Sequence, residues 1–300
     1  MAVTRSGKIR IGISGWRYEP WRGVFYPEKL PQKSELAFAA SKLNSIEING
    51  TFYSLQRPSS FARWAAETPE DFVFSVKGPR FITDIRRLRE VQGPLANFMA
   101  SGVLLLRKKL GAFLWQFPPN FKYQHDLLEN FFKQLPADSI SALKLGQGHD
   151  LRIKTEEGLE ITERFALRHA IEVRNKSFVL PEFVELLRKY QVALVCADTV
   201  EWPRLMDVTS DFMYCRLHGS EKLYEDGYDD KSLDAWASRV TDWARGDEPE
   251  DAERVLEPDA GARNAVRDVF VYFDNDLKVK APVDAMALAA RVKKILPEAL

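Results

Sequence analysis

Eight short runs rich in β-branched and aromatic residues alternate with segments of helical periodicity from one end of the chain to the other. Strands that alternate with helices predict βαβ units and a parallel sheet. Eight strands in a 300-residue chain fit a closed (β/α)8 barrel of the TIM type better than a doubly wound sheet. The predicted strands are Lys8–Ser14, Ser45–Asn49, Asp71–Lys77, Ala112–Phe117, His169–Arg174, Val192–Asp198, Phe212–His218 and Asp268–Asp274.

The segments between these strands repeat their apolar residues at the spacing of a helix. No such pattern is visible after the sixth strand, between Asp198 and Asp211. We expect Pro58 to precede a cap at Ser59, Pro181 to open a helix and Gly111 to end one. The predicted helices are Ser34–Leu43, Ser59–Glu67, Leu95–Leu110, Gln124–Leu135, Pro181–Tyr190, Ser232–Ala244 and Val283–Leu296.

Three stretches are longer than a minimal barrel requires, namely Trp16–Lys33, Asp138–Leu167 and Ala244–Arg267. The first carries five aromatic residues and predicts an ordered loop over the mouth at the C-terminal ends of the strands. The last is polar, and we expect it to be a mobile surface insertion. Because neither a repeat nor a linker is visible, the sequence predicts a single domain over residues 1–300.

Charge and composition exclude several classes of protein. The 43 basic and 43 acidic residues give a formal net charge of zero, so binding of nucleic acid through bulk charge is not expected. No apolar run approaches the ~20 residues that span a bilayer, and residues 1–8 contain no apolar leader. Cys196 and Cys215 lie in apolar runs, which indicates reduced, buried thiols and a cytoplasmic protein.

Polar side chains are predicted to face the inside of the barrel near the C-terminal end of each strand. Side chains alternate along a strand, and the outward face must be apolar where it meets the helices. In the second strand Ile46 and Ile48 therefore point outward, which sends Glu47 and Asn49 inward. The same test directs a further set inward: Ser75, Lys77, Gln116, Glu172, Arg174, Asp198, Arg216, His218 and Asp274.

This convergence of charge has two interpretations. One is a lattice of ion pairs that plugs the barrel and only stabilises it, because buried charge is costly unless it is paired. The other is an active site, since barrel enzymes place their chemistry at this end of the strands. Lys77 favours the second interpretation, because a titratable amine at a strand end suits acid–base or Schiff-base chemistry.

No cofactor motif is evident. Gly12-Ile-Ser-Gly15 lacks the third glycine of a dinucleotide site and the second flanking glycine of a nucleophile elbow. Only His218 among the four histidines falls at the functional end of a strand, which disfavours a multi-zinc centre. A single Mg²⁺ or Mn²⁺ held by Glu47, Glu172, Asp198 and His218 stays open, although nearby cations oppose it.

The chain resembles the YecE-like family, domain of unknown function 72, over about residues 9–295. The motifs that carry the resemblance are Gly12-Ile-Ser-Gly-Trp-Arg-Tyr-Glu-Pro-Trp21, Gly23-Val-Phe-Tyr-Pro27, Glu47-Ile-Asn49, Thr51-Phe-Tyr53, Phe74-Ser-Val-Lys77, Leu114-Trp-Gln-Phe-Pro-Pro119, Glu172-Val-Arg174, Asp198-Thr199, Tyr214-Cys-Arg-Leu-His-Gly219, the spacing of Tyr224, Tyr228, Leu233 and Trp236-Ala237, and Tyr272-Phe-Asp-Asn275.

The resemblance implies a TIM-type barrel, and it implies no established reaction. Two positions depart from the family pattern. Asp84 stands where the family often has histidine, and Asp274 stands where an asparagine is common. A histidine role at position 84 is therefore excluded, and Asp274 adds a carboxylate that other members lack.

The leading hypothesis is an enzyme that performs acid–base chemistry on a small polar or anionic ligand such as a sugar, a sugar phosphate or a nucleotide-like metabolite. Isomerase, lyase and hydrolase reactions all fit, as does a less favoured aldolase mechanism through Lys77. The predicted catalytic residues are Glu47, Lys77, Glu172, Asp198 and His218, and the predicted substrate-binding residues are Trp16, Asn49, Tyr53, Gln116, Arg174, Arg216, Asp274 and Asn275.

Two other classes compete with this hypothesis. A metal-dependent hydrolase of nucleic acid is suggested by fold analogy, and the zero net charge opposes it. A non-catalytic protein that senses a metabolite would use the same pocket without consuming its ligand. The sequence leaves the substrate, the reaction direction, a metal requirement and the oligomeric state open.

Overall fold

The computed structural model describes residues 6–154, 157–161, 163–219, 227–258, 265–275 and 279–300. In these residues eight strands follow one another around a closed barrel in the order β1 to β8. Adjacent strands within each of the two units described below pair in parallel. The predicted (β/α)8 barrel is therefore confirmed. The strands are β1 Ile9–Ser14, β2 Ser45–Ile48, β3 Val73–Lys77, β4 Leu110–Gln116, β5 Arg168–Glu172, β6 Ala193–Asp198, β7 Phe212–Leu217 and β8 Asp268–Phe273.

The chain divides into two compact units. The first unit combines Met1–Ile46 with Lys176–Leu300, and the second unit is Glu47–Asn175. That residues 1–300 form a single domain stays a prediction.

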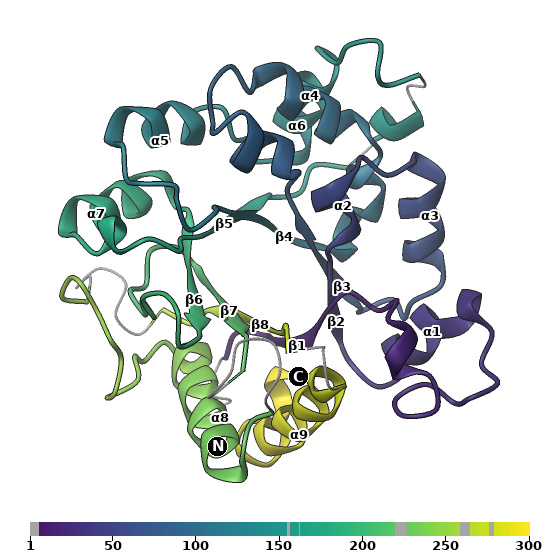
Figure 1. Ribbon diagram of the computed structural model, residues 1–300, viewed down its shortest axis with the longest axis vertical. Helices are drawn as coiled ribbons and strands as arrows, with labels where there is room; N and C mark the ends of the chain where they lie inside the picture. The colour runs from purple at the N-terminus through teal and green to yellow at the C-terminus, as the bar shows by residue number, and fades with distance from the viewer. Residues whose placement is uncertain (1–5, 155–156, 162, 220–226, 259–264, 276–278) are drawn as a thin grey trace. The chain divides into compact units, whose positions relative to one another are not determined.

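In the first unit β6, β7, β8 and β1 are neighbours in that order. Its helices are α1 Glu35–Ala40, α7 Pro181–Tyr190, α8 Asp230–Arg245 and α9 Lys280–Ile295. Helices α8 and α9 lie side by side, coloured green and yellow in Figure 1. Asp229 begins α8 by accepting a hydrogen bond from the Ser232 amide at 2.7 Å. Pro181 occupies the first turn of α7, as predicted.

The aromatic stretch after β1 is a packed cluster. Trp21 and Tyr26 are buried, and Tyr26 and Phe25 pack edge-to-face against Phe38 of α1. The Tyr26 hydroxyl donates a hydrogen bond to the Trp16 carbonyl at 2.6 Å. Burial, and then the charge of Glu35, raises the pKa of Tyr26. The stretch is ordered as expected, and its place over the barrel mouth stays a prediction.

The polar stretch 246–258 makes specific contacts with the rest of the first unit, and its expected mobility stays a prediction. The buried Asp207 carboxylate accepts hydrogen bonds from the amides of Val255 and Leu256 at 2.9–3.1 Å. Arg239 of α8 forms an ion pair with Asp251. Residues 259–264 of the same predicted insertion lie outside the described residues.

In the second unit β4 lies between β3 and β5. Its helices are α2 Gly50–Tyr53, α3 Pro58–Ala66, α4 Gln92–Ala100, α5 His125–Phe132 and α6 Ser139–Gly146, with a π-helical turn at Phe81–Ile85 and a 3-10 segment at Val103–Lys109. Helices α4 and α6 lie side by side (Figure 1). Gln116 and Glu172 are register partners at the ends of β4 and β5.

Several helix boundaries differ from the prediction. The expected helix Leu95–Leu110 is two segments, α4 and the 3-10 segment, because Gly102 between them has a φ of 106°. Gly111 lies within β4 and ends no helix. Pro58 is itself the first residue of α3, and no side chain caps that helix. Residues 199–211, all described, contain no helix after β6.

Both cysteines are buried and free, as expected, and the strand register pairs Cys196 with Cys215 across β6 and β7. Burial is the main cause that raises the pKa of the Cys215 thiol, which disfavours its reactive thiolate form. None of the helices in the described ranges is both long and apolar enough to cross a membrane.

Candidate functional site

The register of β7 and β8 brings three predicted residues together in the first unit. Leu217 pairs with Phe273, so the next residues, His218 and Asp274, leave the two strands at the same level. Arg216 lies two residues before His218 and therefore shares its face of the strand. The Asp274 carboxylate accepts a hydrogen bond from Arg216 at 2.8 Å and lies 3.1 Å from Nδ1 of His218.

This cluster is buried. Arg216 and His218 have no exposed side-chain surface, and Asp274 is 12% exposed. Arg216 also donates to the Ser14 hydroxyl of β1 at 3.3 Å. An arginine sealed from water costs free energy unless a carboxylate pairs with it, and Asp274 supplies that charge. The arrangement is thus a buried arginine–carboxylate–imidazole chain.

Asp198, the last residue of β6, is a second centre of contacts in the first unit. Its carboxylate accepts hydrogen bonds from Arg204 at 3.0 Å and from the Trp236 indole of α8 at 3.1 Å. Burial, followed by the Asp198 charge and hydrogen bond, raises the pKa of Tyr228 well above its usual value. These donors orient the Asp198 carboxylate, which also lines a cavity.

That cavity has a volume of about 750 Å³ and opens beside the end of β6. Asp198, Glu201 and Glu253 contribute acidic groups to its wall, and Lys176 and Arg204 contribute cations. Trp202 also lines it, and its ring packs edge-to-face against His218 with centroids 5.4 Å apart. The volume lies within the usual range for small-molecule sites, and the mixed charge suits a polar ligand.

Asn275 belongs to the same unit and holds a helix in place. Its amide donates to the Asp284 carboxylate of α9 at 2.9 Å, and the Tyr228 amide donates to the same oxygen at 3.1 Å. Burial raises the pKa of Asp284, and these two hydrogen bonds act against that shift. Trp16, also predicted to bind substrate, is buried beside Tyr26.

In the second unit the ends of β4 and β5 bring Gln116, Glu172 and Arg174 together. Arg174 donates through Nε to Glu172 at 2.6 Å and through Nη2 to the Gln116 carbonyl oxygen at 2.9 Å. Glu172 has no exposed side-chain surface, and Arg174 is 10% exposed. Two of the hydrogen-bonding groups of the Arg174 guanidinium, Nε and Nη2, therefore already have partners within the unit.

The remaining predicted residues of the second unit lie at or just beyond the ends of β2 and β3. Glu47 and Lys77 are buried, and the Lys77 ammonium lies 4.4 Å from the centre of the Phe52 ring. The Lys77 carbonyl accepts a hydrogen bond from the Thr51 hydroxyl of α2 at 2.6 Å. The side-chain oxygen of Asn49 is buried and has no hydrogen-bond partner among the described residues. Tyr53 is 69% exposed and lines a different cavity.

The structure thus brings Arg216, His218 and Asp274 together in the first unit and Gln116, Glu172 and Arg174 together in the second. Trp16 and Tyr53 lie apart from these two clusters. That both groups line a single pocket, as the sequence analysis expects, stays a prediction. Within the described ranges there is no group of three or more histidine, cysteine, aspartate or glutamate side chains arranged to hold a metal ion. The Mg²⁺ or Mn²⁺ ion considered for Glu47, Glu172, Asp198 and His218 stays untested.

Comparison with known proteins places the chain in a family. The model of the family described as "Protein of unknown function DUF72" matches residues 10–299. The chain belongs to the DUF72 family. The resemblance seen in the sequence motifs is therefore confirmed.

The chain is similar to curated DUF72 relatives over part of their length. It is 30% identical over 118 residues to the UPF0759 protein YunF of Bacillus subtilis, covering 38% of this chain and 41% of YunF. It is 27% identical over 131 residues to the UPF0759 protein YecE of Escherichia coli K12, covering 43% of this chain and 45% of YecE. The matched region thus spans less than half the length of these relatives.

Two solved DUF72 structures support the fold. A Thermotoga maritima protein has a TM-score of 0.72 at 24% identity, covering 97% of this chain and all of that one. An Enterococcus faecalis protein has a TM-score of 0.65 at 20% identity, covering 96% of this chain and 95% of that one. At these identities the likeness shows the barrel and nothing about the reaction.

Five further residues of the candidate site in the first unit were not predicted from the sequence: Arg204, Tyr228, Trp236, Trp202 and Asp284. Tyr228 and Trp236 occur in the spacing that identified the family, which was a signal of their importance. Tyr224, from the same spacing, lies outside the described residues. Arg204 comes from a loop and Asp284 from a helix, where strand alternation predicts no direction.

Proposed function

We propose that this DUF72 protein is an enzyme that performs acid–base chemistry on a small polar or anionic metabolite such as a sugar, a sugar phosphate or a nucleotide-like compound. The observation that carries the proposal is the chain of contacts from Arg216 through Asp274 to His218. A carboxylate beside one ring nitrogen of a histidine fixes the orientation and the tautomer of the ring.

In the proposed mechanism the Asp274 carboxylate, 3.1 Å from Nδ1 of His218, orients the ring, and Nε2 carries the proton to or from the substrate. Imidazole is suited to this role because it gains and loses a proton near neutral pH. Arg216 contributes by donating a hydrogen bond at 2.8 Å to the same carboxylate oxygen that lies beside His218, which holds the Asp274 side chain in place. Arg216 and Asp274 are therefore positioning residues, and His218 is the proposed catalytic residue.

The proposed substrate occupies the cavity beside Asp198. Lys176 and Arg204 offer cations to an anionic group, and Asp198 offers an acceptor to a hydroxyl. Trp202 lines this cavity and contacts the His218 ring, whereas His218 itself is not exposed. The proposal therefore requires the Trp202 side chain to turn aside when the substrate binds.

The proposal also assigns roles to polar side chains of the second unit. Glu172 is a carboxylate fixed by Arg174, and Lys77 is a buried amine at the end of β3. We propose Glu172 as a general base and Lys77 as an acid, with Gln116 and Asn49 as residues that orient hydroxyl groups. The variant Glu172→Gln in the screen below tests the role of Glu172 separately from that of His218.

The test is a thermal-shift screen of sugar phosphates and nucleotides against the wild type, His218→Gln, Asp198→Asn and Glu172→Gln. Arg89→Gln is the control, because Arg89 is exposed in the second unit and lines none of the cavities described here. We expect a ligand that raises the melting temperature of the wild type and of the control, with the effect reduced or lost in Asp198→Asn. If the same ligands stabilised every variant equally, the site would not be the one proposed.

Turnover separates an enzyme from a sensor. Each ligand that raises the melting temperature is incubated with the protein and followed by ¹H NMR. The proposal predicts that the ligand is consumed by the wild type and that His218→Gln consumes it at least about 100-fold more slowly, the usual scale of general acid–base catalysis. A ligand that binds tightly and remains intact would identify a metabolite-binding protein instead.

A further inference from the structure

A second cavity, in the second unit, has no role in the proposed reaction. It has a volume of about 280 Å³ and lies between α2, the π-helical turn and the N-terminal part of α4. Its wall is mainly apolar, with Phe81, Ile85, Leu55 and Pro94 among the lining side chains. Phe81 is 39% exposed and Ile85 is 62% exposed, although both are large and hydrophobic. Exposed apolar side chains gathered around a cavity mark a site for an apolar group.

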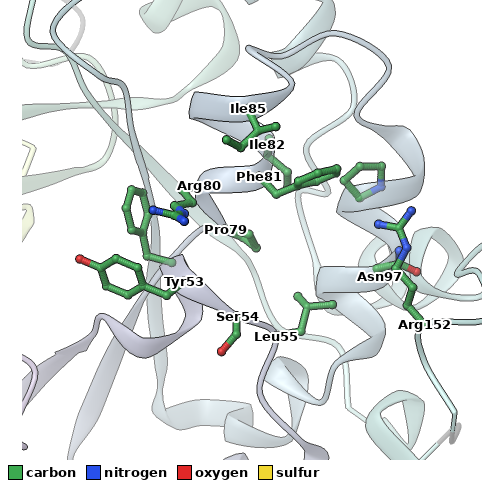
Figure 2. Close-up of a pocket in the computed structure, with 12 residues that line it drawn as sticks. Tyr53, Ser54, Leu55, Pro79, Arg80, Phe81, Ile82, Ile85, Asn97 and Arg152 are labelled. Carbon is green, nitrogen blue, oxygen red and sulfur yellow. The ribbon is translucent and has the colours of Figure 1, made fainter.

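Two arginines stand at the edge of this cavity. The Arg80 guanidinium lies 5.7 Å from the centre of the Tyr53 ring, and the Arg152 guanidinium lies 5.8 Å from the centre of the Phe81 ring. Figure 2 shows Tyr53 and Arg80 on one side of the cavity, with Phe81 and Arg152 on the other. Arg80 makes no ion pair with any described residue, and Arg152 has a partly exposed partner, Asp150, at 3.4 Å.

The cationic edge continues into an adjoining cavity of about 370 Å³. The two cavities share Leu55 and Arg152, and the second is also lined by Arg57, Lys154 and Glu157. The described lining of the two cavities together thus carries four cations and one carboxylate. A groove that is apolar at one end and cationic at the other complements a ligand with an apolar body and an anionic group.

We propose that this groove binds a small aromatic anion, namely a planar ring that bears a carboxylate or a phosphate. The ring lies in the apolar cavity against Phe81 and Ile85, where an aromatic body gains from edge or offset contacts. The anionic group lies at Arg152, whose guanidinium also faces the adjoining cavity. A π-helical turn at Phe81–Ile85 forms part of the wall, and such turns recur at functional sites.

The apolar and aromatic side chains distinguish this ligand from a free inorganic anion. Inorganic phosphate would contact only the cationic end and leave Phe81 and Ile85 exposed to water. A neutral aromatic compound would fill the apolar end and leave the guanidinium groups without a counter-charge. The groove therefore favours a ligand that carries both features on one molecule.

The experiment measures binding of 2-naphthoate by isothermal titration calorimetry, with 2-naphthalenemethanol and inorganic phosphate as separate probes. We expect 2-naphthoate to bind about tenfold or more tightly than the neutral alcohol, because a charge-assisted hydrogen bond is lost in the alcohol. Arg152→Gln should weaken 2-naphthoate about tenfold and leave the alcohol unchanged. Phe81→Ala should weaken both aromatic probes, because it removes apolar contact area.

Two further variants make the result specific. Arg89→Gln removes an exposed arginine that lines neither cavity, and it should bind 2-naphthoate as the wild type does. His218→Gln should also bind it unchanged, because the groove does not depend on the proposed reaction. The proposal would be overturned if 2-naphthoate did not bind, if it bound no more tightly than the alcohol or phosphate, or if Arg152→Gln left its affinity unaltered.

Discussion

His169, the second residue of β5, is buried as a neutral imidazole. Nδ1 accepts a hydrogen bond from the Trp115 indole at 3.2 Å, and Nε2 donates to the Pro136 carbonyl at 2.8 Å. The two partners together define one tautomer, because an indole can only donate and a carbonyl can only accept. Burial lowers the pKa of His169 to about 4, against the opposing effect of the Pro136 carbonyl. This histidine is thus structural, as its place at the start of the strand indicated.

The lowered pKa of His169 predicts a loss of stability in mild acid. In the unfolded chain the imidazole takes up a proton near pH 6.5, and in the folded chain only near pH 4. The unfolded state therefore binds more protons as the pH falls from 6.5 to 4, and the free energy of unfolding decreases by about 3 kcal/mol over that window. His169→Gln should flatten this part of the pH profile in urea unfolding. An unchanged slope in His169→Gln would contradict the assignment.

The Glu172–Arg174 pair in the second unit is predicted to couple strongly. Glu172 is fully buried, so Arg174→Met places a carboxylate charge beside an apolar side chain and should cost about 3 kcal/mol of unfolding free energy. The double variant Glu172→Gln and Arg174→Met should regain much of that loss, because the buried charge is then gone. A double-mutant cycle by chemical denaturation measures the coupling. Additive single effects would show that the pair is not coupled.

At the scale of the secondary structure elements, Gly102 decides how α4 ends. A Cβ atom at this position would lie 2.5 Å from the Cα atom of Pro58, at the start of α3, and the φ of 106° disfavours any other residue. The predicted helix Leu95–Leu110 therefore breaks here, and the following 3-10 segment leads into β4. Helical periodicity in the sequence cannot predict such a close approach between two backbone segments.

Two glycine variants test this account of α4. Gly102→Ala should lower the free energy of unfolding by about 3 kcal/mol, because it adds both a backbone clash and an unfavourable φ. Gly93→Ala, in the first turn of the same helix, meets no atom within 4 Å and should be neutral or stabilise by up to about 1 kcal/mol. Urea denaturation of the two variants measures the difference. Equal effects would contradict the steric explanation.

All eight strands could be predicted from the sequence, because β-rich runs such as Val192–Asp198 are bounded by polar residues and separated by helical patterns. Two helices were not predicted. Helix α2 has four residues, too few to show a period. Helix α6 carries a signal that was overlooked, since Asp138 and Ser141 form a capping box at its start.

For the molecule as a whole, alternation along the strands predicted the polar residues of the candidate site better than it predicted their partners. It correctly placed Arg216, His218 and Asp274 on neighbouring strand ends, where the structure brings them into contact. It could not predict that Arg204 reaches Asp198, because the direction of a loop side chain depends on tertiary packing. The sequence also could not predict that Arg174 pairs with Glu172, because neither residue type specifies which residue of opposite charge it will contact.

Asp274, which departs from the family pattern, allows a structural role of its charge to be distinguished from a role in catalysis. The variant Asp274→Asn keeps the shape of the side chain and removes the charge that Arg216 and His218 share. A purely structural role predicts lower stability with unaltered turnover of any substrate. A positioning role for His218 predicts a fall in kcat by about 100-fold or more, with little change in KM. Steady-state kinetics on the substrate found by the screen separates the two roles.

The most direct test of acid–base catalysis at His218 is a turnover assay on a defined mixture of sugar phosphates and nucleotides, followed by ¹H and ³¹P NMR with wild type, His218→Gln and Arg89→Gln in parallel. Circular dichroism first establishes that each variant is folded. We predict that the wild type and Arg89→Gln convert at least one component and that His218→Gln converts it at least about 100-fold more slowly. Equal conversion by His218→Gln, or a wild type that leaves every component unchanged, would contradict the proposed chemistry on these compounds.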